Sequence, residues 1–70
     1  MPDMHKVASS NIDSVGYDKP SSTLYVSFLS SGLYKYANVP EDVFEGFKAA
    51  KSKGSYFAKV IRPNYKGEKV

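Results

Sequence analysis

The chain has 70 residues, a formal net charge of +3, no cysteine and a single histidine, His5. This length allows one domain with one small core, and the lack of cysteine excludes disulfides and thiolate-bound zinc. A lone histidine does not make a metal site, so we expect neither a metal nor a cofactor. Six tyrosines and four phenylalanines supply apolar surface for the core.

Charge is distributed unevenly along the chain. Residues 1–47 carry a net charge of −3, whereas residues 48–70 carry +6. A basic C-terminal third is typical of a protein that binds an anionic partner, nucleic acid first. The same composition is also typical of a solvated, lysine-rich surface that keeps a small protein soluble.

Residues 1–8 show no hydrophobic periodicity and are predicted to form a flexible N-terminal arm. The run Ile12–Asp18 predicts a strand, and the three-residue step from Ile12 to Val15 indicates a β-bulge. Gly16 indicates either the same irregularity or the close approach of another backbone. After a turn rich in Asp, Pro and Ser, a second antiparallel strand is predicted over Thr23–Leu29.

The loop Ser30-Ser31-Gly32 decides which way the tyrosines of the following strand point. As a three-residue loop with Gly32 left-handed, it pairs Phe28 with Tyr34, and the rings of Tyr34 and Tyr36 face the core. A two-residue turn would shift the register by one and turn both rings outward. The glycine at the third loop position favours the first arrangement, so we predict buried rings with their hydroxyls at the edge.

The residues Val39-Pro40-Glu41-Asp42 predict the start of a helix, because proline suits its first turn and carboxylates there complement the helix dipole. Apolar side chains recur at helical spacing, and Gly54 is predicted as the C-cap. Gly46 inside the helix indicates either close packing on the sheet or a tolerated loss of helix stability. Residues 55–62 predict a second helix, capped by Ser55 and ended by Pro63, although the same pattern fits a strand buried on both faces.

The predicted fold class is α+β, a three-stranded antiparallel meander with two helices packed on one face, in the order β-β-β-α-α. We predict a single domain over residues 9–65. The flexible arm precedes this domain, and residues 66–70 are predicted to form a flexible tail.

Few groups in the sequence are suited to catalysis. A serine nucleophile needs a general base, and the single histidine lies in the predicted arm. The carboxylates Glu41, Asp42 and Glu45 cluster, but the first turn of a helix is where acidic residues belong structurally. The loop before Tyr34 lacks the lysine and the glycine spacing of a phosphate-binding loop. We therefore expect no catalytic residues and no enzymatic activity.

Binding of single-stranded nucleic acid needs cations for the phosphates and exposed rings on which bases stack. The best-placed ring is Tyr25, on the outer sheet face beside Lys35, whereas Tyr34 and Tyr36 would qualify only in the other register. The residues predicted to bind nucleic acid or another partner are Tyr25, Lys35, Lys48, Lys51, Lys53, Lys59, Arg62 and Lys66. The competing interpretation is that the aromatic residues serve the core alone, because a small domain needs them for packing.

A protein-binding module is the third class of function. An uncovered sheet face with Tyr25, Leu29 and Leu33, rimmed by lysine, would form an apolar patch for a larger protein. An unpaired strand edge would offer a second docking mode.

Four blocks in this order, SSNIDSVGYD, LYVSF, GLYKYANVP and AAKSKGSYFAKVIRPNY, resemble the KTSC domain. That family is named after the C-terminal domain of some lysyl-tRNA synthetases, and it also occurs as small stand-alone proteins. Its central mark is Tyr-x-Tyr, here Tyr34-Lys35-Tyr36, and the resemblance spans about residues 7–65. It implies RNA binding, the usual suggestion given the synthetase context, and it brings no catalytic residues.

The chain resembles a stand-alone copy of this domain, of the kind found in bacteria and phages. Small phage proteins often bind host machinery, which gives an alternative function: a transcription regulator that binds host RNA polymerase by protein contacts and inhibits or modifies transcription. No stretch is apolar enough for a membrane span, and MPDMHKVASS does not resemble a signal peptide. We expect a cytoplasmic monomer of a bacterium or phage-infected cell, whose partner is RNA, another nucleic acid or RNA polymerase.

Overall fold

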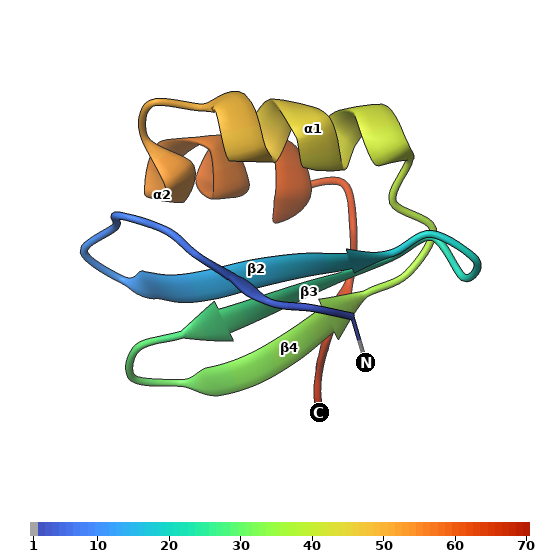
Figure 1. The fold of residues 1–70 in the computed structure, drawn as a ribbon, viewed down its shortest axis with the longest axis horizontal. Coiled ribbons are helices and arrows are strands. Elements are labelled where there is room, and N and C mark those ends of the chain that lie inside the picture. The colour runs from blue at the N-terminus through green and yellow to red at the C-terminus, as the bar shows by residue number, and fades with distance from the viewer. Residues whose placement is uncertain (1) are drawn as a thin grey trace.

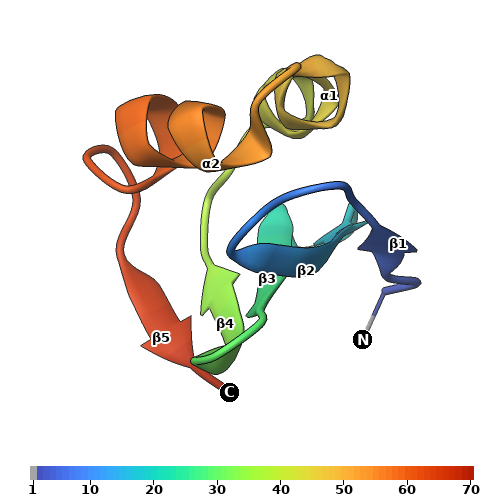
Figure 2. The same cartoon turned by 90° about the vertical axis from the view of Figure 1, so that its left-hand side faces the viewer.

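The computed structural model describes residues 2–70 as two layers, an antiparallel sheet and a helical layer that covers one face of it (Figure 1). The five strands lie in chain order, β1-β2-β3-β4-β5, as Figure 2 shows from the side. The strands are β1 His5–Lys6, β2 Ile12–Asp18, β3 Thr23–Phe28, β4 Gly32–Tyr36 and β5 Gly67–Lys69. The helices are α1 Glu41–Ala49 and α2 Lys53–Tyr56, which continues into the π-helical turn η1, Phe57–Ile61. The predicted α+β class with helices on one sheet face is confirmed, and the predicted number of three strands is wrong.

Strand β2, which lies between β1 and β3, has the predicted bounds and the predicted bulge. Its pairing with β3 shifts between Ile12 and Ser14, so Asp13 is the extra residue. This extra residue lets Ile12 and Val15 both point into the core although they are three positions apart. Both side chains are buried.

The β3–β4 hairpin has a three-residue loop that lies one position earlier than predicted. Strand β3 ends at Phe28, which pairs with Gly32 and not with Tyr34. Gly32 begins β4 with a φ of +92°, the left-handed conformation that the sequence predicts for it. Because the register differs from the predicted one by two residues, the faces are unchanged, and Tyr34 and Tyr36 point to the core side.

Helix α1 starts as predicted but ends sooner. Pro40 precedes its first residue, and Glu41 and Asp42 occupy its first turn. Ala50 is already extended, and its carbonyl accepts a hydrogen bond from the ammonium of Lys53. The predicted C-cap at Gly54 is therefore wrong, because that residue lies inside α2.

The second helical segment settles the choice between helix and strand in favour of helix. Its cap is Ser52 and not Ser55: the Ser52 hydroxyl accepts a hydrogen bond from the Ser55 N–H at 3.3 Å. Its second half is wider than an α-helix, since the Arg62 N–H donates to the Phe57 carbonyl at 2.9 Å, an i→i+5 bond. Such π-helical turns are rare and frequently occur at functional sites.

Each end of the chain adds an edge strand that the sequence did not predict. His5 of β1 pairs with Val15, and Gly67 of β5 pairs with Tyr36. These strands are short and mostly polar, so they carry no hydrophobic alternation from which a strand could be predicted. The mobility of the predicted arm and tail stays a prediction, and Met1 lies outside the described residues.

The N-terminal residues also contact the outer face of the sheet at Gly16. A Cβ on Gly16 would lie 2.7 Å from the Met4 sulfur and 2.8 Å from the Asp3 carbonyl oxygen. Of the two roles predicted for this glycine, the close backbone approach is the correct one. Since Gly16 pairs with Tyr25, the outer face near Tyr25 is partly covered by this segment.

The core lies between the sheet and the helices. Its buried apolar residues are Ile12, Val15, Leu24, Val26, Tyr36, Val39, Phe44, Phe47 and Ile61. Among the described residues, no helix has the length and apolar character needed to cross a membrane.

Candidate functional site

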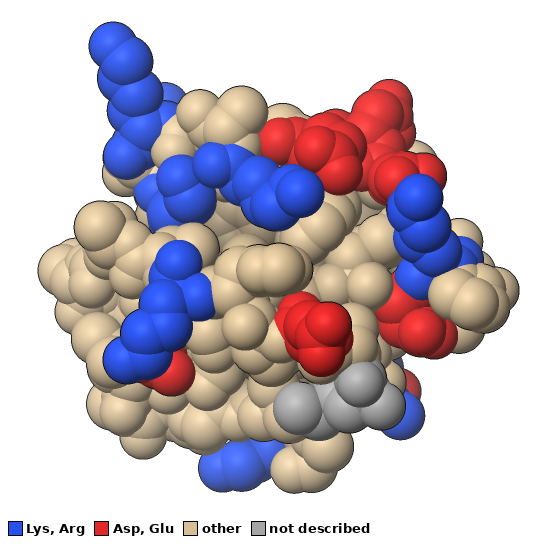
Figure 3. Space-filling view, viewed as in Figure 1, with Lys and Arg blue, Asp and Glu red and all other residues tan. Residues whose placement is uncertain are grey.

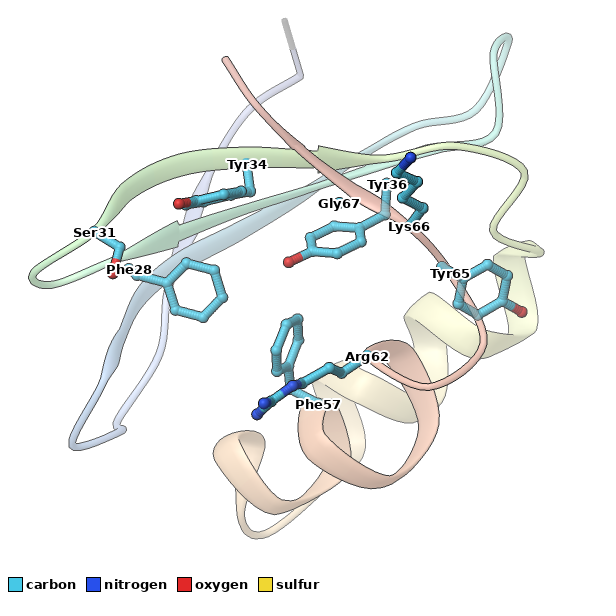
Figure 4. Close-up of a pocket in the computed structure, with 9 residues that line it drawn as sticks. All are labelled: Phe28, Ser31, Tyr34, Tyr36, Phe57, Arg62, Tyr65, Lys66 and Gly67. Atoms are coloured by element: carbon cyan, nitrogen blue, oxygen red, sulfur yellow. The ribbon is translucent and has the colours of Figure 1, made fainter.

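An open cleft lies between the β4–β5 side of the sheet and the π-helical turn (Figure 4). Its volume is about 680 Å³, within the range of ligand-binding clefts. It is lined by Phe28, Ser31, Tyr34, Tyr36, Phe57, Arg62, Tyr65, Lys66 and Gly67. Three segments thus build it: the β3–β4 hairpin, the π-helical turn and the residues that lead into β5.

Four aromatic rings form a connected wall of this cleft. The centroid of Phe28 lies 5.6 Å from that of Tyr34 and 5.2 Å from that of Phe57, and the Phe57 centroid lies 5.6 Å from that of Tyr36. The interplanar angles of 76–78° make all three contacts edge-to-face, a favourable arrangement for aromatic pairs. The hairpin and the π-helical turn therefore fix the orientation of both tyrosines.

The hydroxyls of the cleft residues Tyr34 and Tyr36 differ from those of Tyr17 and Tyr56. Tyr17 and Tyr56 each donate a hydrogen bond to a backbone carbonyl. Within residues 2–70, the hydroxyls of Tyr34 and Tyr36 bond to no protein group, and no side-chain oxygen is both buried and unpaired. These two hydroxyls are therefore accessible from the cleft.

The Tyr36 phenol interacts electrostatically with two other groups of the cleft. Burial raises the pKa of Tyr36 above its usual value, Tyr34 raises it further, and the Arg62 guanidinium lowers it. Tyr36 is therefore neutral at physiological pH and can both donate and accept a hydrogen bond.

Arg62 and Lys66 give the cleft a positive edge. Both side chains are exposed, and no Asp or Glu belongs to the cleft lining. The ion pairs of the described part of the chain are Lys6–Asp13, Lys19–Glu41 and Lys48–Glu45. The two cleft cations are thus available to an external anion.

The eight residues predicted to bind a partner are distributed over separate parts of the surface. Arg62 and Lys66 line the cleft. Tyr25 and Lys35 pair across β3 and β4, with their side chains on the outer sheet face, away from the cleft. The structure therefore places these two pairs of predicted residues on separate surfaces.

The remaining predicted cations lie around the helical layer. Lys48 and Lys53 line a second groove of about 300 Å³ with residues of the β1 edge, and Lys48 is paired with Glu45 at 3.5 Å. Lys51 and Lys59 are exposed and line neither hollow. Figure 3 shows basic side chains over the end of the helical layer where α1 stops, and acidic ones over its start.

Sequence reasoning left most of the cleft out of the predicted site. It assigned Tyr34 and Tyr36 to the core, which is the side they face, but the same side of β4 also borders the cleft. Phe57 and Tyr65 are not among the residues predicted to bind a partner. The available signal was that both aromatic residues lie within five positions of Arg62 in the sequence.

The groups that the cleft brings together suit binding. They comprise ring surface, hydroxyl groups and two cations. The clustered carboxylates lie elsewhere, on α1. Glu41 and Asp42 occupy its first turn, where Glu41 pairs with Lys19 at 3.1 Å, and Glu45 pairs with Lys48 at 3.5 Å. No group of three His, Cys, Asp or Glu side chains in residues 2–70 is arranged to hold a metal ion.

Comparison with known proteins identifies a family of similar chains. The sequence profile of the KTSC domain matches residues 8–65. A crystal structure of a KTSC domain protein from Yersinia pestis is similar, with a TM-score of 0.96 and 36% sequence identity, over 100% of this chain and 99% of that one. An uncharacterized protein from Stutzerimonas stutzeri is 39% identical over 64 residues, 89% of this chain and 90% of that protein.

A similar segment also occurs inside much longer proteins. The lysine–tRNA ligase of Nostoc punctiforme is 35% identical over 65 residues. This match covers 93% of the chain but only 12% of the ligase.

Proposed function

The chain belongs to the KTSC domain family, and we propose that it is a non-enzymatic module that binds single-stranded RNA through the cleft. The proposal depends on one observation: aromatic rings and two unpaired cations border the same open cleft. Single-stranded RNA is recognised by this combination, since its phosphates need cations and its unstacked bases need ring surface.

The absence of acidic side chains from the cleft lining supports an anionic ligand. A carboxylate there would repel phosphates and would pair with Arg62 or Lys66 in the free protein. Because neither pairing occurs within the described residues, both cations can contact phosphates without first breaking an ion pair.

The similarity to part of a lysine–tRNA ligase supports RNA over DNA as the ligand. The name of that relative describes an enzyme that acts on tRNA, and the matched segment is a small part of it. This support is an analogy of context and carries less weight than the cleft itself.

The proposal is tested by titrating the protein with a fluorescent ten-nucleotide single-stranded RNA at several salt concentrations. We expect affinity to fall steeply with salt, by roughly 0.7 in log–log slope for each phosphate contact, and double-stranded RNA to bind more weakly. Unchanged amide chemical shifts of the protein on addition of the RNA at low salt would contradict the proposal.

A pull-down from lysate, with and without nuclease, tests the alternative of a transcription regulator that contacts RNA polymerase. RNA binding predicts that co-purifying material is lost after nuclease treatment. Stoichiometric recovery of RNA polymerase that survives nuclease would favour the alternative and overturn the RNA proposal.

A further inference from the structure

We infer that the cleft takes one unstacked nucleotide of the bound strand, and that the hydroxyls of Tyr34 and Tyr36 hydrogen-bond to the edge of its base. The phosphates on either side of this nucleotide would contact Arg62 and Lys66. The inference rests on the proposed function, and it adds the unit of RNA that is recognised and the residues that recognise it.

The two hydroxyls form a prearranged pair. Tyr34 and Tyr36 are two positions apart on β4, so they lie on the same face of the sheet, and Figure 4 shows both rings directed into the cleft. Phe28 and Phe57 pack edge-to-face on them, and the backbone of Gly67 lies against Tyr36. Because the ring positions are fixed before binding, less conformational entropy is lost when a ligand binds to the two hydroxyls.

A nucleobase matches the chemistry of these hydroxyls. Each hydroxyl can donate one hydrogen bond and can also accept one. Within the described chain, neither the Tyr34 nor the Tyr36 hydroxyl makes such a bond. The edge of a base carries donors and acceptors in one plane, and its flat faces suit a wall of rings. A purely apolar ligand would leave both hydroxyls without partners, which is unfavourable.

The two cations indicate a nucleotide within a strand. Figure 4 shows Arg62 and Lys66 on different sides of the Tyr36 ring, with Arg62 on the helical segment and Lys66 on the segment that leads into β5. A nucleotide inside a strand has a phosphate on both sides, and it therefore satisfies the two cations together.

The test uses variants that separate the hydroxyls from the rings and the charges. Y34F/Y36F keeps both rings and all charges, whereas R62Q/K66Q keeps all hydroxyls. Binding to ten-nucleotide oligo(A), oligo(U) and oligo(C) is measured for each variant over a range of salt concentrations.

We expect the wild type to discriminate among the three oligonucleotides. The Y34F/Y36F variant should lose this discrimination and bind its preferred base about tenfold more weakly, with an unchanged salt slope. The R62Q/K66Q variant should keep the preference but lower the salt slope by about 1.4, because two phosphate contacts are lost. Thermal unfolding checks that each variant is folded. If Y34F/Y36F does not fold, the single variant Y34F replaces it, because Tyr34 is only half-buried.

Other outcomes separate this inference from the proposed function. If the wild type binds RNA but Y34F/Y36F shows the same affinity and the same preference, the inference is wrong and RNA binding stands. If no RNA binds, both are wrong. If a phosphotyrosine peptide shifts the cleft amides at lower concentration than the oligonucleotides do, the cleft recognises a modified protein and the inference is overturned.

Discussion

The ring of Tyr36 lies directly against the backbone of Gly67. The two residues pair across β4 and β5, and a Cβ on Gly67 would lie 2.5 Å from Tyr36 Cε2 and 3.0 Å from its hydroxyl oxygen. Such distances are well inside van der Waals contact, so β5 closes over the ring only because residue 67 has no side chain. The C-terminal strand therefore helps to hold the Tyr36 hydroxyl in place at the cleft.

The variant G67A tests this contact. We expect it to destabilise the fold by about 1–3 kcal/mol and to shift the ring resonances of Tyr36, because an added methyl group overpacks the site. The neighbouring variant E68A is the control, since that side chain is exposed and should change stability by no more than about 0.5 kcal/mol. Equal unfolding free energies for G67A and the wild type would show that β5 does not pack on Tyr36.

The raised pKa of Tyr36 predicts a loss of stability in alkali. The folded state holds the phenolic proton more tightly than the unfolded chain does, so the contribution is complete below the unfolded pKa of about 10. It is lost as the pH rises through the higher folded pKa, when the buried phenol ionises. Unfolding free energies measured from neutral to strongly alkaline pH should show a decline that is smaller in Y36F.

The pKa of Tyr36 also reports whether Arg62 and Tyr34 lie close to its phenol. Replacing Arg62 by glutamine should raise the pKa of Tyr36 further, because the guanidinium lowers it in the wild type. Y34F should lower the pKa, since Tyr34 raises it. An NMR titration of the Tyr36 Cζ resonance measures both shifts, and identical titration curves in R62Q and wild type would place Arg62 away from the phenol.

A second tight contact joins the two helices. Gly46 packs closely against α2, and not on the sheet, which was one of the two roles predicted for it. A Cβ on Gly46 of α1 would lie 2.6 Å from the hydroxyl oxygen of Tyr56, which donates to the Val43 carbonyl at 3.0 Å. Helix propensity alone predicts that G46A gains about 1 kcal/mol, but we expect net destabilisation because the hydroxyl is displaced and its hydrogen bond is lost. In a Y56F background G46A should cost less, and an equal cost in both backgrounds, measured by chemical denaturation, would disprove the coupling.

The contact between the N-terminal segment and Gly16 predicts that a larger residue at position 16 will displace this segment. A methyl group there would meet the Asp3 carbonyl oxygen at 2.8 Å, and backbone cannot move aside by a simple rotation. We expect G16A to displace residues 2–4 from the sheet and to make them more accessible to protease. Deletion of residues 2–4 should remove most of the stability difference between G16A and wild type, whereas an undiminished difference would contradict this interpretation.

The parts of the fold that were predictable are those in which side-chain pattern and turn chemistry agree. The bulge followed from the spacing of Ile12 and Val15, and the inward tyrosines followed from the left-handed Gly32. A hairpin register can differ by two residues without changing any face, which is why the predicted faces were correct although the predicted pairs were not.

The edge strands β1 and β5 and the π-helical turn could not be predicted from the hydrophobic pattern of the sequence. His5–Lys6 and Gly67–Lys69 are ordered by backbone pairing with a neighbour, and backbone hydrogen bonds leave no periodicity in the sequence. The cleft was missed for a related reason. It forms where β5 and the π-helical turn lie beside β4. The predicted sheet ended at β4, so it contained no second side for a cleft next to Tyr34 and Tyr36.

The central claim is that RNA binds at the cleft, and two charge-matched variants test it most directly. R62Q/K66Q removes two positive charges from the cleft, while K35Q/K51Q removes two exposed charges that lie outside it. We predict that the cleft variant binds single-stranded RNA at least about tenfold more weakly, and that the control changes affinity by no more than about twofold. Equal losses in the two variants, or a greater loss in K35Q/K51Q, would contradict the claim.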